Sequence, residues 1–143
     1  MASSPTLIGE LVALRDEGKC RFIGMSGYPM HTLRRAISET DLDVVLSYSH
    51  STLLDQCLQD RLLPLAEERG VGVINAAAVA LGLLTPGELR INHPAGPEIR
   101  AAADSVRAIC ADRGVDISFL ANQLSIQRSD AATTLIGTVN RIT

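Results

Sequence analysis

Apolar residues occur in this chain in two patterns: short continuous runs, and longer stretches with an apolar residue every three or four positions. The short runs lie at residues 21–25, 44–46, 71–74 and 133–137, and polar residues or glycines follow them. Apolar runs of this length without polar alternation are typical of strands buried on both faces. The pattern therefore predicts four strands of one parallel sheet.

The stretches with helical spacing lie before, between and after these runs. Proline is favoured in the first turn of a helix because its missing N–H costs nothing there, and glycine often follows the last turn. The expected helices cover about 5–17, 29–39, 57–69, 97–113 and 116–125. In the helix after Pro97, the spacing directs four residues inward: Ile99, Ala102, Val106 and Cys110.

Helices that alternate with buried strands predict an α/β fold, with a parallel sheet covered by helices. Residues 76–96 are an exception, because they form a long stretch with turn signals at Pro86-Gly87 and at 92–94. We expect residues 1–143 to form a single unit, in line with the usual length of one domain.

Composition excludes several classes of protein. Apolar residues make up 46% of the chain and charged residues 20%, which argues against disorder. The net charge is −3, with no clustered basic face and 3% aromatic residues, which argues against nucleic-acid binding. The most apolar stretch, 71–84, is shorter than the roughly 20 residues of a membrane span, so we expect no membrane partner.

The three cysteines lie far apart, and none belongs to a Cys-x-x-Cys pair. This usage predicts neither a disulfide framework nor a zinc site, and together with a start unlike a secretory signal it favours a reducing, cytoplasmic setting. The three histidines show no metal-binding spacing. His50 lies in a polar segment, where the simplest interpretation is a solvated loop residue, and Asp41, Asp43 and Asp60 are interpreted as solvated caps.

Three segments resemble the aldo-keto reductase family. Residues 17–29 (EGKCRFIGMSGYP) are similar to its EGK-x-R-x-IG-x-S signature, and 71–85 to its V-x-x-x-SPL-x-x-G-x-LT segment. Residues 134–140 (TLIGTVN) are similar to its last strand and the following loop. The Ser-Gly-Tyr-Pro variant and the sequences at 46–49 and 93–98 resemble the branch of L-galactose and D-arabinose 1-dehydrogenases.

The resemblance implies a (β/α)8 TIM barrel, a fold of about 250 residues, of which this chain matches strands five to eight. We therefore expect a partial barrel of about four parallel strands with outer helices. Half a barrel leaves both sheet edges and the inner face open, so self-association through these edges is expected.

The family transfers a hydride between a nicotinamide cofactor, NAD or NADP, and a carbonyl carbon, using a Tyr, Lys, Asp and His tetrad from earlier strands. Here the only lysine, Lys19, precedes the first strand, whereas catalytic groups of such barrels follow the strands. Tyr28 and Tyr48 follow strands but have no lysine within reach. We therefore expect no catalytic residue in this chain.

The match to the family's cofactor contacts is better. Ser26 aligns with a serine near the nicotinamide carboxamide, whereas Gly27 stands where many members have asparagine. Three alanine and valine positions replace the family's Ser-Pro-Leu, which weakens the expected grip on the pyrophosphate. The cofactor-binding positions implied by the resemblance are Ser26, Gly27, Ala77, Ala78, Val79, Gly82, Leu83, Gly137, Thr138 and Asn140.

Two functions of different class remain open at this point. The first is an NAD(P)-dependent dehydrogenase that oxidises an aldose at C1, with little turnover by this chain alone. The second is a non-catalytic half-barrel association module, or an inactive fragment, with residual nucleotide binding. An enzyme of another phosphate-binding barrel family would need acidic or lysine residues at the strand ends, which the sequence does not place there.

Overall fold

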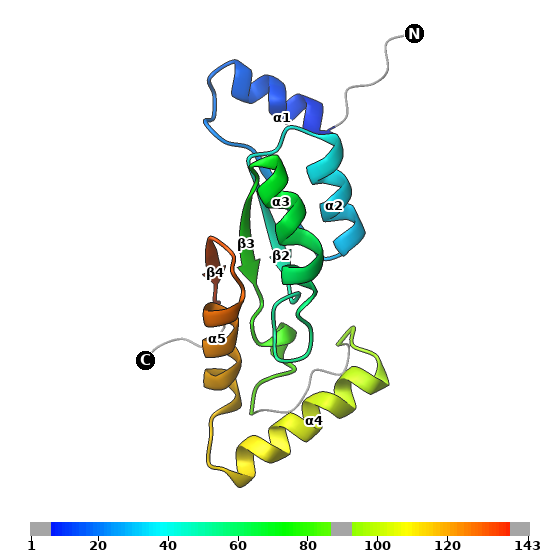
Figure 1. Cartoon of the computed structure of the whole chain (residues 1–143), viewed down its shortest axis with the longest axis vertical. Helices are drawn as coiled ribbons and strands as arrows, with labels where there is room; N and C mark the ends of the chain where they lie inside the picture. The colour runs from blue at the N-terminus through cyan, green and yellow to red at the C-terminus, as the bar shows by residue number, and fades with distance from the viewer. Residues whose placement is uncertain (1–6, 87–92, 138–143) are drawn as a thin grey trace.

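A computed structural model describes residues 7–86 and 93–137 of the chain. Its centre is one parallel four-stranded sheet with the strand order β1-β2-β3-β4, so neighbours in sequence are neighbours in the sheet (Figure 1). The strands are β1 (Gly24–Gly27), β2 (Val44–Tyr48), β3 (Gly72–Ala76) and β4 (Thr133–Leu135). The helical elements are α1 (Leu7–Asp16), α2 (Met30–Glu39), the π-helical segment η1 (Leu58–Leu62), α3 (Leu63–Arg69), the short 3₁₀ turn η2 (Ala80–Gly82), α4 (Pro97–Asp112) and α5 (Ile117–Arg128).

The first three strands start level with one another, and one glycine sets the distance between two of them. Gly24 lies opposite Val44, which lies opposite Gly72 on the other side. A Cβ atom on Gly24 would come within 2.4 Å of the Val44 carbonyl oxygen and 2.5 Å of Val44 Cγ1. Only glycine therefore permits this close approach of β1 to β2.

Two apolar clusters stabilise the chain. The first packs the sheet, through Val45 and Val73, against α1, α2 and α3, with Leu33, Leu58 and Leu62 among its buried residues. The second packs the segment after β3 against α4 and α5, at the far end of the molecule (Figure 1). Leu46 and Ile74 alternate with the valines, so they point to the opposite face of the sheet, and they belong to neither cluster.

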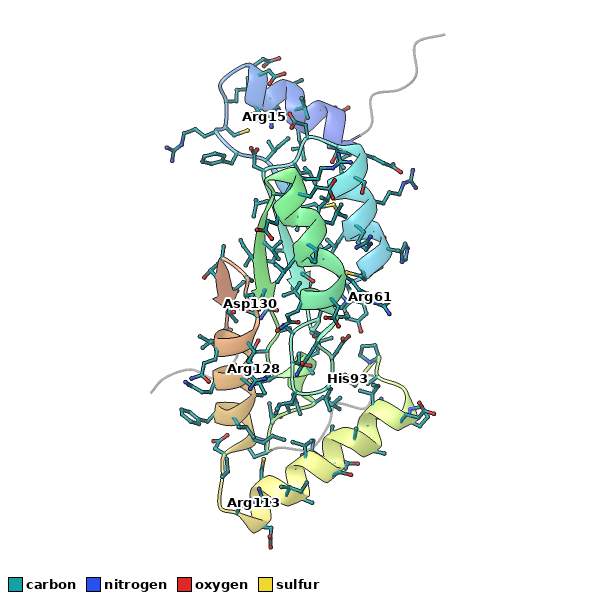
Figure 2. The ribbon with its side chains drawn as sticks, viewed as in Figure 1. Arg15, Arg61, His93, Arg113, Arg128 and Asp130 are labelled. Atoms are coloured by element: carbon teal, nitrogen blue, oxygen red, sulfur yellow. The ribbon has the colours of Figure 1, made fainter. Side chains whose placement is uncertain are left out.

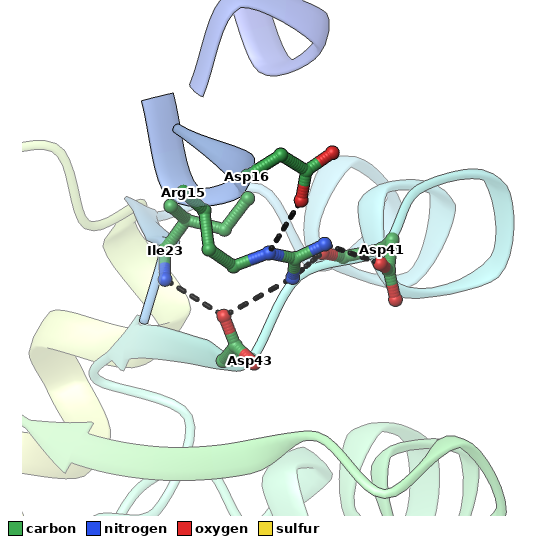
Figure 3. Close-up of polar contacts among 5 residues, drawn as sticks. All are labelled: Arg15, Asp16, Ile23, Asp41 and Asp43. Atoms are coloured by element: carbon green, nitrogen blue, oxygen red, sulfur yellow. Dashed lines mark hydrogen bonds and ion pairs between the residues drawn. The ribbon is translucent and has the colours of Figure 1, made fainter. Parts of the chain in front are cut away.

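A cluster of polar contacts around Arg15 lies at the amino end of the sheet (Figure 3). Arg15 of α1 donates to the carboxylate of Asp41 at 2.5 Å and to Asp43 Oδ2 at 3.4 Å. The same Asp43 oxygen accepts the Ile23 N–H at 2.8 Å. The carboxylates stabilise the guanidinium, and the hydrogen bond to Asp41 is the main reason that the pKa of Arg15 is raised. Asp43 is therefore a fixed structural acceptor, so its interpretation as a solvated cap is wrong.

The predicted pattern of strands and helices is confirmed, with two local corrections. The first strand begins at Gly24, three residues after the start of the apolar run. In α4, Ile99 is 43% exposed and Ala102 is also exposed, whereas Ala103 and Cys110 are buried. Val106 and Cys110 therefore face inward as predicted, whereas Ala103 takes the place expected for Ala102, because α4 packs against the segment after β3 and against α5 and not directly on the sheet.

Candidate cofactor site at the carboxyl edge of the sheet

The carboxyl ends of the strands lie side by side, because the register is parallel and in step. Tyr48 ends β2 opposite Ala76, the last residue of β3, and Ala76 lies opposite Leu135, the last residue of β4. The segments that leave the strands therefore gather at one edge, which in parallel α/β folds is where ligands bind.

The loop after β2 is buried where the sequence predicted solvent. His50 is only 6% exposed, and its Nδ1 atom lies 2.7 Å from the buried Ser47 hydroxyl. Its ring stacks on Tyr28, with ring centroids 5.5 Å apart. Burial lowers the pKa of His50, with Asp55 opposing the shift. The interpretation of His50 as a solvated residue is therefore wrong: the ring is a neutral support beneath Tyr28.

The segment after β3 forms a tight turn of left-handed residues. Ala77 has φ 59°, Leu81 has φ 57° and Gly82 has φ 98°. The turn is closed by hydrogen bonds from Ala80 N–H to Ala77 O at 2.8 Å and from Gly82 N–H to Val79 O at 3.1 Å. Non-glycine residues in this region are strained, and such strain is typical of functional sites.

Two backbone donors in this turn are unused. Within the described part of the chain, the N–H groups of Ala78 and Val79 donate to no acceptor. Ala78 is only 2% exposed. Buried backbone donors nearly always have a partner, and successive free N–H groups in a turn are suited to an anion such as phosphate.

One arginine side chain of α4 binds the end of the same turn. Arg107 donates to the carbonyl of Leu83 at 2.9 Å and to that of Thr85 at 3.2 Å. The Thr85 hydroxyl in turn donates to Gly82 O at 2.8 Å. The carbonyl groups of Leu83 and Thr85, at the end of the turn, therefore accept hydrogen bonds from α4.

A cavity of about 210 Å³ lies beside the turn. It is open to one side and is lined by the segments after β1, β2 and β3 and by the start of α4. Its lining combines polar groups with aliphatic ones, and includes Tyr28, Thr52, Asp55, Leu83, His93 and Ile99.

The structure brings some of the predicted cofactor positions together and separates others. Ala77, Ala78, Val79, Gly82 and Leu83 belong to the one turn, although the Ala78 and Leu83 side chains are buried, so only the backbone is available at these two positions.

The remaining predicted positions lie elsewhere. Ser26 is exposed on β1, with β2 between it and β3. A Cβ on Gly27 would come within 3.2 Å of Leu33 Cδ2, so this position faces α2. Gly137 is exposed after β4, and Thr138 and Asn140 lie outside the described residues.

A buried polar network near this edge was missed by sequence reasoning. Asn75 is fully buried and donates to Ser125 Oγ of α5 at 2.8 Å, and Ser125 donates to Ser51 O at 2.7 Å. It connects β3, α5 and the loop after β2. The signal was present in the sequence, because Asn75 is the polar residue inside the apolar run from 71 to 84.

The thiol of Cys57, in the segment after β2, is not an activated nucleophile. Burial raises the pKa of the Cys57 thiol to about 12, so it stays protonated at neutral pH. Among residues 7–86 and 93–137, no group of three His, Cys, Asp or Glu side chains is placed to hold a metal ion. Within those same ranges, no helix has the length and apolar character needed to cross a bilayer.

Comparison with known proteins agrees with this arrangement. The Aldo/keto reductase family model matches residues 3–142. The L-galactose dehydrogenase of Arabidopsis thaliana is 38% identical over 133 residues, covering 91% of this chain and 41% of that protein. The D-arabinose 1-dehydrogenase of Saccharomyces cerevisiae is 32% identical over 128 residues, covering 82% of this chain and 38% of that protein.

The fold comparison gives the same result. An aldo-keto reductase of Bacillus halodurans in its holo form aligns with a TM-score of 0.65 at 22% identity, covering 93% of this chain and 45% of that one. The prediction of a partial (β/α)8 barrel is confirmed. The chain spans about two fifths of the length of the two curated relatives above.

Proposed function

The chain belongs to the aldo/keto reductase family, and we propose that it supplies the cofactor-binding half of an NAD(P)-dependent aldose 1-dehydrogenase. Members of the family are oxidoreductases, and aldose dehydrogenases are among the relatives of this chain. The substrate is proposed to be an aldose of the L-galactose or D-arabinose type, oxidised at C1. Three free cysteines suit a reducing, cytoplasmic setting for this enzyme.

The observation that carries the cofactor proposal is the pair of unused donors in the turn after β3. The N–H groups of Ala78 and Val79 have no acceptor in the described part of the chain, although Ala78 is almost completely buried. A dinucleotide phosphate would supply the missing acceptor oxygens. Gly82 allows the backbone of the turn to double back without strain at that position, because its φ of 98° suits only glycine.

Ser26 is proposed to contact the nicotinamide end of the cofactor. It is exposed at the carboxyl end of β1, and its hydroxyl can both donate and accept a hydrogen bond, as a carboxamide requires. Gly27 presents no side chain to this end, and its Cβ position is filled by Leu33. Gly137, Thr138 and Asn140 are proposed contacts toward the adenosine end. The choice between NAD and NADP is left to measurement.

The proposed role excludes catalysis by this chain alone. Its only lysine, Lys19, lies before β1 and pairs with Glu17 at 2.5 Å, so it belongs to the amino end of the sheet. Tyr28 and Tyr48 lie at the carboxyl edge without a lysine to lower the energy of a tyrosinate. Hydride transfer would need the proton donor and its partners from other strands of a complete barrel.

The experiment is a titration of the purified chain with NAD⁺ and NADP⁺ by calorimetry, with two matched glycine variants. Gly82→Ala and Gly96→Ala both add a methyl group with no atom within 4 Å, but only Gly82 has a left-handed φ. We expect Gly82→Ala to weaken nucleotide binding about tenfold, because strain of this kind costs about 1 to 3 kcal/mol, and Gly96→Ala to leave it unchanged.

Equal affinities for both variants, or no binding by the unchanged chain, would contradict the cofactor proposal. A second assay follows NAD(P)H absorbance with L-galactose and D-arabinose. We expect no steady turnover, and steady turnover would contradict the assignment of catalysis to other strands.

A second candidate function, an association module, is favoured by the open side of the sheet. Leu135 and Ile136 are 57% and 48% exposed at the β4 edge. Exposed apolar strand edges promote pairing with another chain. Sedimentation of the purified chain tests this candidate: a discrete dimer would support it, and a monomer with cooperative melting would contradict it.

A further inference from the structure

His93 uses both nitrogens of its ring to join two segments. Its Nδ1 accepts the Ala95 N–H at 3.0 Å, and its Nε2 lies 2.9 Å from Ala80 O, to which it donates. Only a neutral imidazole with its proton on Nε2 can make both bonds, because a protonated ring has no acceptor. Figure 2 shows His93 between the start of α4 and the loops at the ends of the strands.

The segment that His93 holds is the strained part of the turn after β3. Ala80 and Leu81 have φ angles of 49° and 57°, which are unfavourable for residues with a Cβ atom. Ala80 O also accepts the Leu83 N–H at 3.1 Å, so the His93 bond acts on the atom that closes the turn. A strained conformation persists only where surrounding contacts enforce it.

The backbone of His93 is itself fixed to α4. Arg100 donates to His93 O at 2.6 Å and, through Nε, to Ala95 O at 2.8 Å. Arg100 therefore places a positive charge near the imidazole, while Tyr28 and Asp55 are the other titratable groups that line the same cavity in the described part of the chain.

We propose that His93 is a positioning residue whose two ring hydrogen bonds hold the Ala80–Gly82 turn in its left-handed conformation. Resting on the proposed function, we also infer that loss of these bonds weakens nucleotide binding. The N–H groups of Ala78 and Val79, which have no acceptor in the described part of the chain, lie immediately before Ala80, so loosening the turn would disturb both donors.

The first test measures the turn without any nucleotide. Amide hydrogen exchange, corrected for the intrinsic rate, is followed by NMR for Gly82, Leu83 and Leu84, whose N–H groups bond within the turn. In His93→Ala we expect their protection to fall about tenfold, as for the loss of one buried hydrogen bond, with β2 amides unchanged. The control is His31→Ala, an exposed histidine of α2.

A second variant keeps the hydrogen-bonding capacity in part. His93→Gln retains a donor and an acceptor, so its turn amides should keep more protection than those of His93→Ala. Turn amides with the same protection in His93→Ala as in the unchanged chain would overturn the proposal.

The second test measures the NAD⁺ and NADP⁺ affinity of the same variants. We expect His93→Ala to bind about tenfold more weakly than the unchanged chain, and His31→Ala to bind equally well. Looser turn amides with unchanged affinity would overturn the link to nucleotide. If the unchanged chain binds neither nucleotide, the proposed function fails for this chain, and the amide measurements alone decide the role of His93 in the turn.

Discussion

The two ends of the sheet are built differently. At the amino end, Arg15 joins Asp41 and Asp43, and the chain packs into the aliphatic cluster of α1, α2 and α3 (Figure 3). At the carboxyl end, Ser49 and Ala77 leave β2 and β3 with left-handed φ angles, and hydrogen bonds of His50 and Asn75 lie beside the apolar cluster that packs on α4 and α5.

Because of this difference, one end of the strands serves stability and the other end is available for ligand binding. The amino end pairs Arg15 with two carboxylates and gives the Ile23 N–H an acceptor, so it fixes the start of β1 against the start of β2. Among the residues that the structure describes, the carboxyl end has N–H groups without an acceptor, an Asn75 Oδ1 atom without a partner, and strained turns. These are unfavourable unless a ligand or a neighbouring contact uses them. The same division of labour is general in (β/α)8 barrels.

The largest effect on stability is expected from adding a side chain at the point where β1 approaches β2 most closely. Gly24→Ala places a methyl group 2.4 Å from the Val44 carbonyl oxygen, so the strands must separate, at a cost of about 3 kcal/mol in the free energy of unfolding. Gly72→Ala is the matched control, because its added Cβ meets nothing nearer than 3.6 Å. Chemical denaturation measures both; equal stabilities would show that the close approach does not matter.

The next largest effect on stability distinguishes the two carboxylates that bind Arg15 at the amino end. Asp43→Ala removes the acceptor of the Ile23 N–H as well as a partner of Arg15, and we expect a loss of about 2 kcal/mol. Asp41→Ala removes an exposed ion pair and should cost clearly less, because solvent screens such pairs. Urea unfolding of the two variants compares them, and a larger loss for Asp41→Ala would reverse the assignment.

An alanine-to-glycine substitution is expected to change the free energy of unfolding differently at a left-handed position and inside a helix. Ala77→Gly relieves a left-handed φ of 59°, so the free energy of unfolding should stay the same or rise by about 0.5 kcal/mol. Ala101→Gly, at an exposed position inside α4, should lower it by about 1 kcal/mol. Thermal melts compare the pair; a loss at position 77 as large as at 101 would mean that the turn is not strained.

The smallest effect is a pH dependence that arises from His50. Because burial lowers the pKa of His50 below 6.5, the unfolded chain takes up its proton first as the pH falls. Stability should therefore decrease from about pH 7 to pH 5. His50→Gln should flatten this slope, whereas His31→Gln, at an exposed position of α2, should not. Identical slopes in urea titrations of all three proteins would contradict a buried neutral ring.

Much of the fold could be predicted because apolar runs and helical spacing are local properties. The four strands, the end of α3 at Gly70 and the capping of α5 by Asp116 all lie where the pattern placed them. His50 and α4 were mispredicted for one reason. Their burial depends on segments distant in sequence: Ser47 and Tyr28 enclose His50, and α4 packs on residues after β3 and not on the sheet.

The sequence by itself determined the order of elements, the parallel sheet and the family, since these follow from periodicity and from motifs read in a line. The tertiary structure decided which polar groups are satisfied. Among residues 7–86 and 93–137, it left the Ala78 and Val79 N–H groups without an acceptor and gave both nitrogens of His93 a partner. Hydrogen-bond pairing depends on the positions of atoms brought together by folding, and no local pattern in the chain specifies those positions.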